Sequence, residues 1–331
     1  MTDFRTLIQL QDLDKPKPIQ YSDNILTLGS CFAENIGKKL ENLCYAQSLN
    51  PFGILYNPAA MAKSLKRLQM QQFFAHNDIF EEKGIWQSFM HHSKFGNENP
   101  NTTLNQINKA YEKGCLYFQK ANYWILTLGT AWVYEHIERQ EIVNNCHRQS
   151  AKNFKRFRLG VAQIVDAFMP IFEAAIHKNP NWQCIMTVSP IRHIKDTLHG
   201  NQLSKSTLLL AIDALQTAFP KNVFYFPAYE IMLDDLRDYR FYEADMLHPS
   251  AVAIDYIWSI FKSHYLAAPD EKLRHQIQQI QNAAQHRPFN INTPAHQQFV
   301  LEHIEKIRQI KKQNLSLDFS HLEAAFIAQL V

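Results

Sequence analysis

The sequence has little glycine, almost no net charge and no long apolar stretch. Only nine glycines occur in 331 residues, so a glycine at the end of a predicted strand is more informative than usual. The net charge of +3 is too small to favour nucleic acid, and no stripe of Lys and Arg interleaves with aromatic residues. We therefore expect no nucleic-acid partner.

Cysteine is also scarce, and its spacing matches no metal site. The five cysteines are odd in number, widely spaced and without a CxxC pair or a Cys/His cluster. They are Cys31, Cys44, Cys115, Cys146 and Cys184. We expect a reduced, cytoplasmic protein without a structural metal, in which one cysteine could still be a reactive thiol.

The sequence also contains no candidate membrane segment. The N-terminal stretch MTDFRTLIQLQDLDKPKP has no basic segment leading into an apolar run, which argues against a signal peptide or a membrane anchor. No window reaches 18 apolar residues. We therefore expect no membrane partner. With 46% hydrophobic residues, the chain should bury a sizeable core.

Short apolar runs bounded by turn residues predict the strands of a central sheet. They lie at 25–29, 123–129, 184–189 and 223–227. Between them, apolar residues recur at helical spacing. They are Phe32, Ile36, Leu40 and Leu43; Leu159, Ile164, Phe168 and Ile171; and Leu208, Ile212 and Leu215. Alternating strands and helices predict an α/β fold, a three-layer α/β/α sandwich with a mainly parallel sheet.

Two additions to this core are expected. The stretch 58–122 contains no convincing strand and several helical patterns, which predicts a helical insertion. The segment 265–331 is rich in Gln, Lys and His and includes the helical pattern FVLEHIEKIRQIKK. We interpret 1–264 as one domain and 265–331 as a helical extension packed on it. If copies of the chain associate, we expect the contact on this extension.

The letters ILTLG occur at 25–29 and return at 125–129. In a parallel sheet, ligands bind beyond the carboxyl ends of the strands. Ser30 and Cys31 would therefore lie on a turn from strand to helix, where free amides and the helix dipole favour an anion. The alternative is structural, with Ser30 capping the helix and Cys31 as a small buried filler.

A second candidate site is YEADMLHPSAVAIDYIW at 242–258. Pro249 is a natural first residue of a helix, which places Asp245 and His248 in the loop before it. Three residues apart, the carboxylate can orient the imidazole while the imidazole takes a proton from a nucleophile. Alone, Asp-x-x-His is more often a surface turn.

A nucleophile after the first strand and Asp-x-x-His before the last core helix together resemble the SGNH/GDSL hydrolase superfamily. GSCFA at 29–33 matches the motif that names the GSCFA family, a bacterial family placed in that superfamily. Other stretches agree with the resemblance. They are NPFGILYNP at 50–58, TLGTAWVYE at 127–135, SPIRHIKD at 189–196 and DMLHPS at 245–250. The resemblance implies a flavodoxin-like sheet and an esterase or acyltransferase.

The resemblance also implies catalytic roles. The superfamily's first block is Gly-Asp-Ser with serine as nucleophile, so the register on 29–31 favours Cys31, and a slip of one residue would restore Ser30. Asp245 and His248 match the last block, which makes His248 the general base and Asp245 its orienting partner. Thioester chemistry at Cys31 departs from the family pattern.

The oxyanion donors are harder to match. Gly53 in NPFG fits the second block, although it could equally be a turn glycine. The third block, Gly-x-Asn, aligns with residues 129–131, where Ala131 replaces the asparagine. We expect Thr130, or a residue such as Asn145, to substitute for a donor that is worth ~2.7–4 kcal/mol elsewhere; otherwise the protein is a weak or unusual catalyst.

Four further residues are candidate substrate contacts, and three of them have a structural alternative. Arg192, which could clamp a carboxylate or phosphate, and His193 follow a predicted strand end. His147 and Trp86 could line the rim. Arg192 could instead form a surface ion pair, His147 could be structural, and Trp86 could belong to the core.

The resulting hypothesis is a hydrolase or acyltransferase that acts on an ester or related acyl bond of a small molecule or carbohydrate-linked substrate. It requires no cofactor and no metal. The alternative is an inactive SGNH-fold binding or scaffold protein, because the third-block asparagine is missing and a fold does not guarantee its usual reaction.

Overall fold

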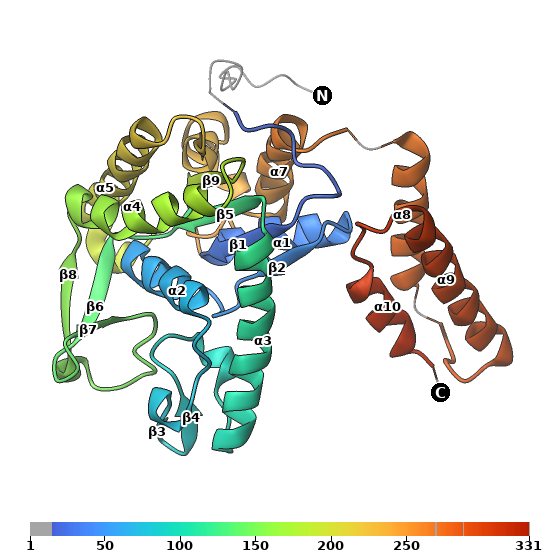
Figure 1. Ribbon diagram of the computed structural model, residues 1–331, viewed down its shortest axis with the longest axis horizontal. Coiled ribbons are helices and arrows are strands. Elements are labelled where there is room, and N and C mark those ends of the chain that lie inside the picture. Colours follow the sequence, from blue (N-terminus) through green and yellow to red (C-terminus); the bar gives the residue numbers. More distant parts are fainter. Residues whose placement is uncertain (1–14, 269, 287, 331) are drawn as a thin grey trace.

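The computed structural model of the chain describes residues 15–268, 270–286 and 288–330. Its centre is a parallel sheet in the order β10-β9-β5-β1-β2 (Figure 1). The strands are β1 (Ile25–Gly29), β2 (Gln47–Leu49), β5 (Tyr123–Leu128), β9 (Gln183–Val188) and β10 (Val223–Phe226). The four predicted strands are confirmed, while β2, only three residues long, has no apolar run that would predict it.

Helices cover both faces of the sheet. On one face lie α1 (Cys31–Asn42) and α7 (Ala251–Tyr265); on the other lie α2 (Pro58–Met70), α3 (Pro100–Lys120), α4 (Val161–Lys178) and α5 (Thr197–Ala218). Successive strand residues serve opposite layers, since Ile25 packs with α1 and α7 while Leu26 packs with the second group. The predicted three-layer α/β/α fold is confirmed.

The strand order fixes where a ligand site belongs. Numbered along the chain, the core strands have the flavodoxin-like order 2-1-3-4-5, because the chain adds β2 on one side of β1 and then returns to add β5 on the other. Such sheets bind ligands at the carboxyl ends of the two strands that flank the reversal. Here these strands are β1 and β5.

The insertion is not purely helical, so that prediction was partly wrong. Between α2 and α3 the chain forms an antiparallel hairpin of β3 (Phe80–Glu82) and β4 (Ile85–Gln87). Lys83 and Gly84 both have positive φ, 54° and 80°, as a tight hairpin turn requires. Three-residue strands are too short to give a clear period-2 pattern.

A second, three-stranded antiparallel sheet follows β5. It consists of β6 (Trp132–His136), β7 (Glu141–Val143) and β8 (Phe154–Arg158) in the order β7-β6-β8. In Figure 1 this small sheet and the C-terminal helices lie on opposite sides of the core. No sequence pattern predicts this sheet, because its strands are half exposed and carry charged residues.

The start of α7 also differs from the prediction. The helix begins at Ala251, and the Ser250 side chain caps it by accepting a hydrogen bond from Ala253 N at 3.4 Å. Pro249 precedes the cap and pairs with Tyr242 in an isolated bridge. Before it, a three-residue helix α6 (Ala228–Glu230) continues into a π-helical turn at Ile231–Asp235.

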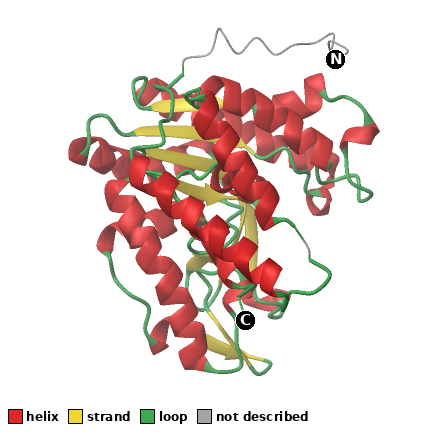
Figure 2. Ribbon diagram, turned by 90° about the vertical axis from the view of Figure 1, so that its right-hand side faces the viewer, coloured by secondary structure: helices red, strands yellow, loops and turns green. Residues whose placement is uncertain are grey.

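The C-terminal extension has its own apolar cluster. It comprises α8 (Glu271–Ala284), α9 (Pro294–Gln313) and α10 (Ser320–Ile327). The helices stand beside the α1 and β2 side of the core, and Figure 2 looks onto them with the strands behind. Their cluster includes Cys44, whose carbonyl accepts a hydrogen bond from Asp318 N at 2.9 Å.

Two expectations concern membranes. Within the described ranges, every helix is too short or too polar to span a bilayer. Residues 1–14, most of the stretch for which we expect neither a signal peptide nor an anchor, lie outside the described residues.

Candidate active site

A cleft of about 510 Å³ lies beyond the carboxyl ends of β1 and β5. Its walls come from the turn after β1, the residues just before α2, the small sheet, the loop after β9 and the loop before α7. None of its lining residues lies beyond His248, so the C-terminal helices take no part in it. The cleft is where the strand order predicts a ligand site.

The turn after β1 gives Ser30 and Cys31 different surroundings. Ser30 is buried, and its Oγ caps α1 by accepting a hydrogen bond from Phe32 N at 3.3 Å. Cys31 is the first residue of α1 and is partly exposed, with its Sγ 3.8 Å from the Tyr56 hydroxyl. Both residues line the cleft, but the serine oxygen is committed to the helix while the thiol is not.

Asp245 and His248 form an ordered pair. His248 Nδ1 lies 2.6 Å from Asp245 Oδ2, and Asp245 Oδ1 accepts hydrogen bonds from the amides of Leu247 and His248 at 2.8 and 3.0 Å. These two amides and then the imidazole lower the pKa of Asp245 to about 2. The aspartate therefore stays ionised at neutral pH. Because Nδ1 of His248 faces Asp245, the other imidazole nitrogen, Nε2, points away from the carboxylate.

The expected oxyanion donors are not free in the way the resemblance implies. Gly53 lies outside the cleft lining, and its amide donates to Asn50 O at 2.7 Å. Its φ is +77°, and an added Cβ would lie 2.3 Å from His92 Cβ. Gly53 thus occupies the turn position that we weighed as its alternative role.

Thr130 does line the cleft, but its groups are engaged. Its amide donates to Tyr56 O at 2.9 Å, while Oγ1 accepts from Trp132 N at 3.1 Å and pairs with Ser204 Oγ at 3.0 Å. Ala131, which aligns with the missing asparagine, is fully buried and points into the core rather than the cleft. Cys31 N, at the first position of α1, has no carbonyl partner within the helix.

Sequence reasoning missed Tyr56 and Asn57 as site residues, although both belong to the quoted stretch NPFGILYNP. Both line the cleft. Burial raises the pKa of Tyr56 far above its usual value, so its hydroxyl stays protonated beside Cys31 Sγ. Asn57 is 6% exposed and caps α2 through Oδ1. The Asn-Pro pair at 57–58 was a recognisable helix start, but nothing in the sequence placed it near Cys31.

The wall formed by the small sheet was missed as well. Arg156 lies 4.3 Å from the Trp132 ring centroid and forms an ion pair with the buried carboxylate of Asp196. Lys195 Nζ donates to the Tyr134 hydroxyl at 2.6 Å. Trp132, Tyr134, Arg156 and Lys195 give the cleft an aromatic and cationic wall, in which Asp196 offsets the charge of Arg156. Asn145, our alternative to Thr130, is also in the lining and accepts a hydrogen bond from His147 N at 2.9 Å.

The loop after β9 brings two of the expected substrate contacts into the cleft. Arg192 lies 5.9 Å from the Tyr242 ring centroid, and no carboxylate of the described residues lies within ion-pair distance of it. The His193 ring meets Tyr56 edge-on, with centroids 6.2 Å apart. Burial, and then the charge of Lys205, lowers the pKa of His193 to about 4. Arg192 is therefore the better candidate for an anion contact.

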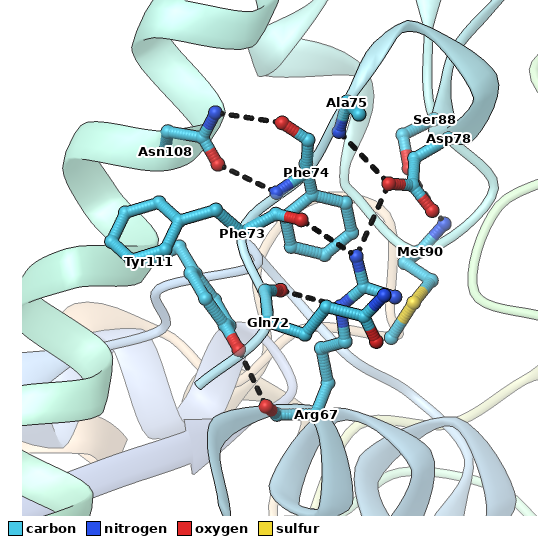
Figure 3. Close-up of polar contacts among 10 residues, drawn as sticks. All are labelled: Arg67, Gln72, Phe73, Phe74, Ala75, Asp78, Ser88, Met90, Asn108 and Tyr111. Atoms are coloured by element: carbon cyan, nitrogen blue, oxygen red, sulfur yellow. Dashed lines mark hydrogen bonds and ion pairs between the residues drawn. The ribbon is translucent and has the colours of Figure 1, made fainter. Parts of the chain in front are cut away.

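The other two expected contacts lie outside the cleft lining. His147 is buried, with Nε2 2.8 Å from Ser88 O, and Trp86 lies on β4 with its amide bonded to Asn97 O at 2.8 Å. Trp86 belongs to the insertion, where Arg67 holds the nearby chain through Asp78, Gln72 O and Phe73 O (Figure 3), whereas His147 follows β7 and contacts the insertion at Ser88. Their structural alternatives therefore describe them better.

A scan against protein-family models gave two matches to the chain. The model described as the GSCFA family matches residues 24–261, and the model described as the GSCFA domain protein, C-terminal domain, matches residues 277–331. The chain belongs to the GSCFA family. Searches of curated proteins and of solved structures found no match.

The GSCFA motif can now be placed in the fold. Its Gly29 ends β1, where an added Cβ would lie 2.4 Å from Thr127 O, so the neighbouring strand excludes a side chain. Ser30 is the cap of α1, Cys31 faces the cleft, and Phe32 and Ala33 are buried. Four of the five motif residues thus shape the turn, and one presents a reactive group.

Among the described residues, no group of three or more His, Cys, Asp or Glu side chains is arranged to hold a metal ion. The chemistry that this chain offers in the cleft is a thiol beside a phenol, an imidazole held by a carboxylate, and an unpaired guanidinium.

Proposed function

We propose that this GSCFA protein is an SGNH-like hydrolase or acyltransferase that cleaves an ester or related acyl bond through a thioester on Cys31. The observation that carries the proposal is the cleft itself, which is lined by Cys31 and by His248, the partner of Asp245, although 216 positions separate Cys31 from His248 in the chain. The flavodoxin-like strand order supports the superfamily assignment.

In the proposed reaction, His248 Nε2 accepts the proton of the Cys31 thiol as sulfur attacks the acyl carbon. Asp245 keeps the imidazole oriented and stabilises its charged form. The carbonyl π electrons move to oxygen, and Cys31 N donates to the resulting oxyanion at the positive end of α1. Collapse expels the alcohol, which takes the proton from His248, and water or another alcohol then releases the acyl group.

The cleft wall supports a substrate with both an anionic and a ring-shaped part. Arg192 offers an unpaired guanidinium for a carboxylate or phosphate. Trp132 and Tyr134 add aromatic surface for a sugar ring or another flat group, although Arg156 lies over both rings and Lys195 over that of Tyr134. A small acidic or carbohydrate-linked ester fits this wall, and the reduced state of all five cysteines supports a cytoplasmic setting.

The second candidate is an inactive binding protein. The observations that favour it are the engaged amide of Gly53 and the engaged hydroxyl of Thr130, which leave the expected oxyanion donors occupied.

Turnover of p-nitrophenyl acetate by wild type, Cys31→Ala and Cys146→Ala separates the two. Cys146 lines the same cleft, but burial raises its pKa to about 11, so it is a matched control thiol. We expect Cys31→Ala to lose at least ~10³-fold in kcat/KM and Cys146→Ala to stay within twofold. Turnover that survives Cys31→Ala but not Ser30→Ala would move the nucleophile to Ser30. A wild type that neither turns over nor labels with acylating probes would favour the binding protein.

A further inference from the structure

Two helices of this protein begin with the same pair of residues. Asn57-Pro58 starts α2, and Asn99-Pro100 starts α3. Both asparagines cap through Oδ1: Asn57 accepts from Ala60 N at 2.7 Å, and Asn99 from the amides of Asn101 and Thr102 at 2.9 and 3.2 Å. Their surroundings differ, since Asn99 is exposed while Asn57 is buried in the wall of the cleft.

The cap fixes the orientation of the Asn57 amide. Because an amide N–H must meet an acceptor, the atom facing Ala60 N is the oxygen, and Nδ2 points the other way. Among the described residues, Asn57 Nδ2 has no hydrogen-bond partner, and it is not one of the side-chain nitrogens sealed from solvent. Asn57 lines the cleft and its side chain is otherwise buried, so the unpaired Nδ2 donor faces the cleft.

The backbone before Asn57 places it at the reacting centre. Leu55 N donates to Gly29 O at 2.9 Å, at the end of β1, and Tyr56 O accepts from Gly129 N and Thr130 N at 2.8 and 2.9 Å, beyond the end of β5. The Tyr56 hydroxyl contacts Cys31 Sγ at 3.8 Å. The segment thus passes between the two strand ends that flank the nucleophile, and Asn57 is its next residue.

We propose that Asn57 is a catalytic residue whose Nδ2 donates the second hydrogen bond to the oxyanion, in place of the asparagine missing at position 131. This inference rests on the proposed function. As the carbon–sulfur bond forms, the carbonyl π electrons move to oxygen, where Cys31 N and Asn57 Nδ2 both donate. When the intermediate collapses, the carbon–oxygen double bond returns and the alcohol leaves with the proton held by His248.

The matched asparagines provide the test. Asp and Ser both keep a capping oxygen for α2, but neither presents the neutral N–H donor. We expect Asn57→Ser and Asn57→Asp to lower kcat for p-nitrophenyl acetate by about 10²–10³-fold, the usual effect of losing one oxyanion donor. Asn99→Asp should stay within twofold, and thermal unfolding should be cooperative in all three variants.

A second readout separates an oxyanion role from general damage. Alkylation of Cys31 by iodoacetamide forms no oxyanion, so Asn57→Ser should leave its rate within about threefold of wild type. Turnover of Asn57→Ser within threefold of wild type would overturn the inference, as would an equal loss of turnover and alkylation. If wild type fails to turn over, or Cys31→Ala retains turnover, the proposed function fails and the inference with it.

Discussion

The letters Ile-Leu-Thr-Leu-Gly occur twice in the chain, and the two copies lie side by side in neighbouring parallel strands. Gly29 pairs with Thr127, so the second copy extends two residues further along the same edge. We name the two regions the open end, Gly29–Cys31, and the closed end, Gly129–Ala131. The repeat specifies two buried strands, and the residues directly after each copy decide what chemistry that end can offer.

At the closed end, the chain uses its backbone groups for structure. Gly129 N donates to Tyr56 O at 2.8 Å, Ala131 N donates to Ser204 Oγ at 2.8 Å, and Gly129 O accepts from Lys205 Nζ at 2.7 Å. At the open end, a helix starts at once, and its first side chain, Cys31, faces the cleft. Gly29 N and Ser30 N donate to Asn50 Oδ1 and Thr127 O, so the turn into the helix leaves one amide, Cys31 N, and one side chain available, whereas the strand that continues into a second sheet leaves neither.

The largest effect is expected from removing His248, the proposed base for the open end. His248→Ala should lower kcat by ~10²–10⁴-fold, because a positioned proton acceptor contributes that much. Asp245→Asn should also reduce turnover, since the amide side chain cannot stabilise the charged imidazole. Steady-state turnover of p-nitrophenyl acetate measures both, and near-normal turnover of His248→Ala would contradict the assigned role.

Ala131→Asn places at the closed end the asparagine that the resemblance to SGNH hydrolases implies, and it sharpens the comparison. Ala131 is fully buried in the core, so a larger polar side chain there should cost about 3 kcal/mol in unfolding free energy through crowding and desolvation. We expect no increase in kcat. Urea unfolding and turnover report on the two effects, and a stable variant with higher kcat would show that position 131 faces the cleft after all.

Lys205→Met tests whether Lys205 is charged in the folded protein. Its Nζ donates to Gly129 O at the closed end and to Ser189 O, both at 2.7 Å. Burial lowers the pKa of Lys205 to about 7 in the folded protein. Above pH 7 and below the ordinary lysine pKa, Lys205 is therefore mostly neutral in the folded chain and charged in the unfolded chain. The unfolding free energy of wild type should therefore rise relative to Lys205→Met, by about 2 kcal/mol from pH 7 to pH 9. A constant difference in urea unfolding would mean that Lys205 stays charged.

Thr130→Val is expected to have the smallest effect. The variant removes the hydroxyl that accepts from Trp132 N and pairs with Ser204, which should cost ~1 kcal/mol in unfolding free energy. Because this hydroxyl is already engaged, kcat should change less than threefold. A loss of tenfold or more would instead make Thr130 the oxyanion donor that substitutes for the missing asparagine.

The sequence predicted the core and only part of the site, for physical reasons. Strands buried on both faces appear as continuous apolar runs, which is why β5 and β9 could be located within about a residue. Asp245 and His248 are three residues apart, so their contact is nearly local. Tyr56 is different: it reaches Cys31 only because the chain crosses between two strand ends, and no local pattern encodes that crossing.

Local pattern also failed where side chains were ambiguous. Trp132 and Arg156 lie on half-exposed strands, where charged residues interrupt the alternation of apolar and polar side chains. The sequence therefore did not predict the strands that carry the cationic wall. Gly53 resembled the glycine of an SGNH block by its letters, yet its positive φ and engaged amide show a turn. A single glycine cannot reveal whether its amide or its missing side chain is what matters.

Locating an acyl group on the protein during turnover tests the central claim, that Cys31 is the nucleophile, most directly. Wild type, Ser30→Ala and Cys31→Ala are quenched in acid during turnover of p-nitrophenyl acetate, and their peptides are analysed by mass spectrometry. We predict an acetyl group on Cys31 in wild type and Ser30→Ala that neutral hydroxylamine removes, and none in Cys31→Ala. A hydroxylamine-resistant acetyl group on Ser30, or one that persists in Cys31→Ala, would contradict the assignment of Cys31 as the nucleophile.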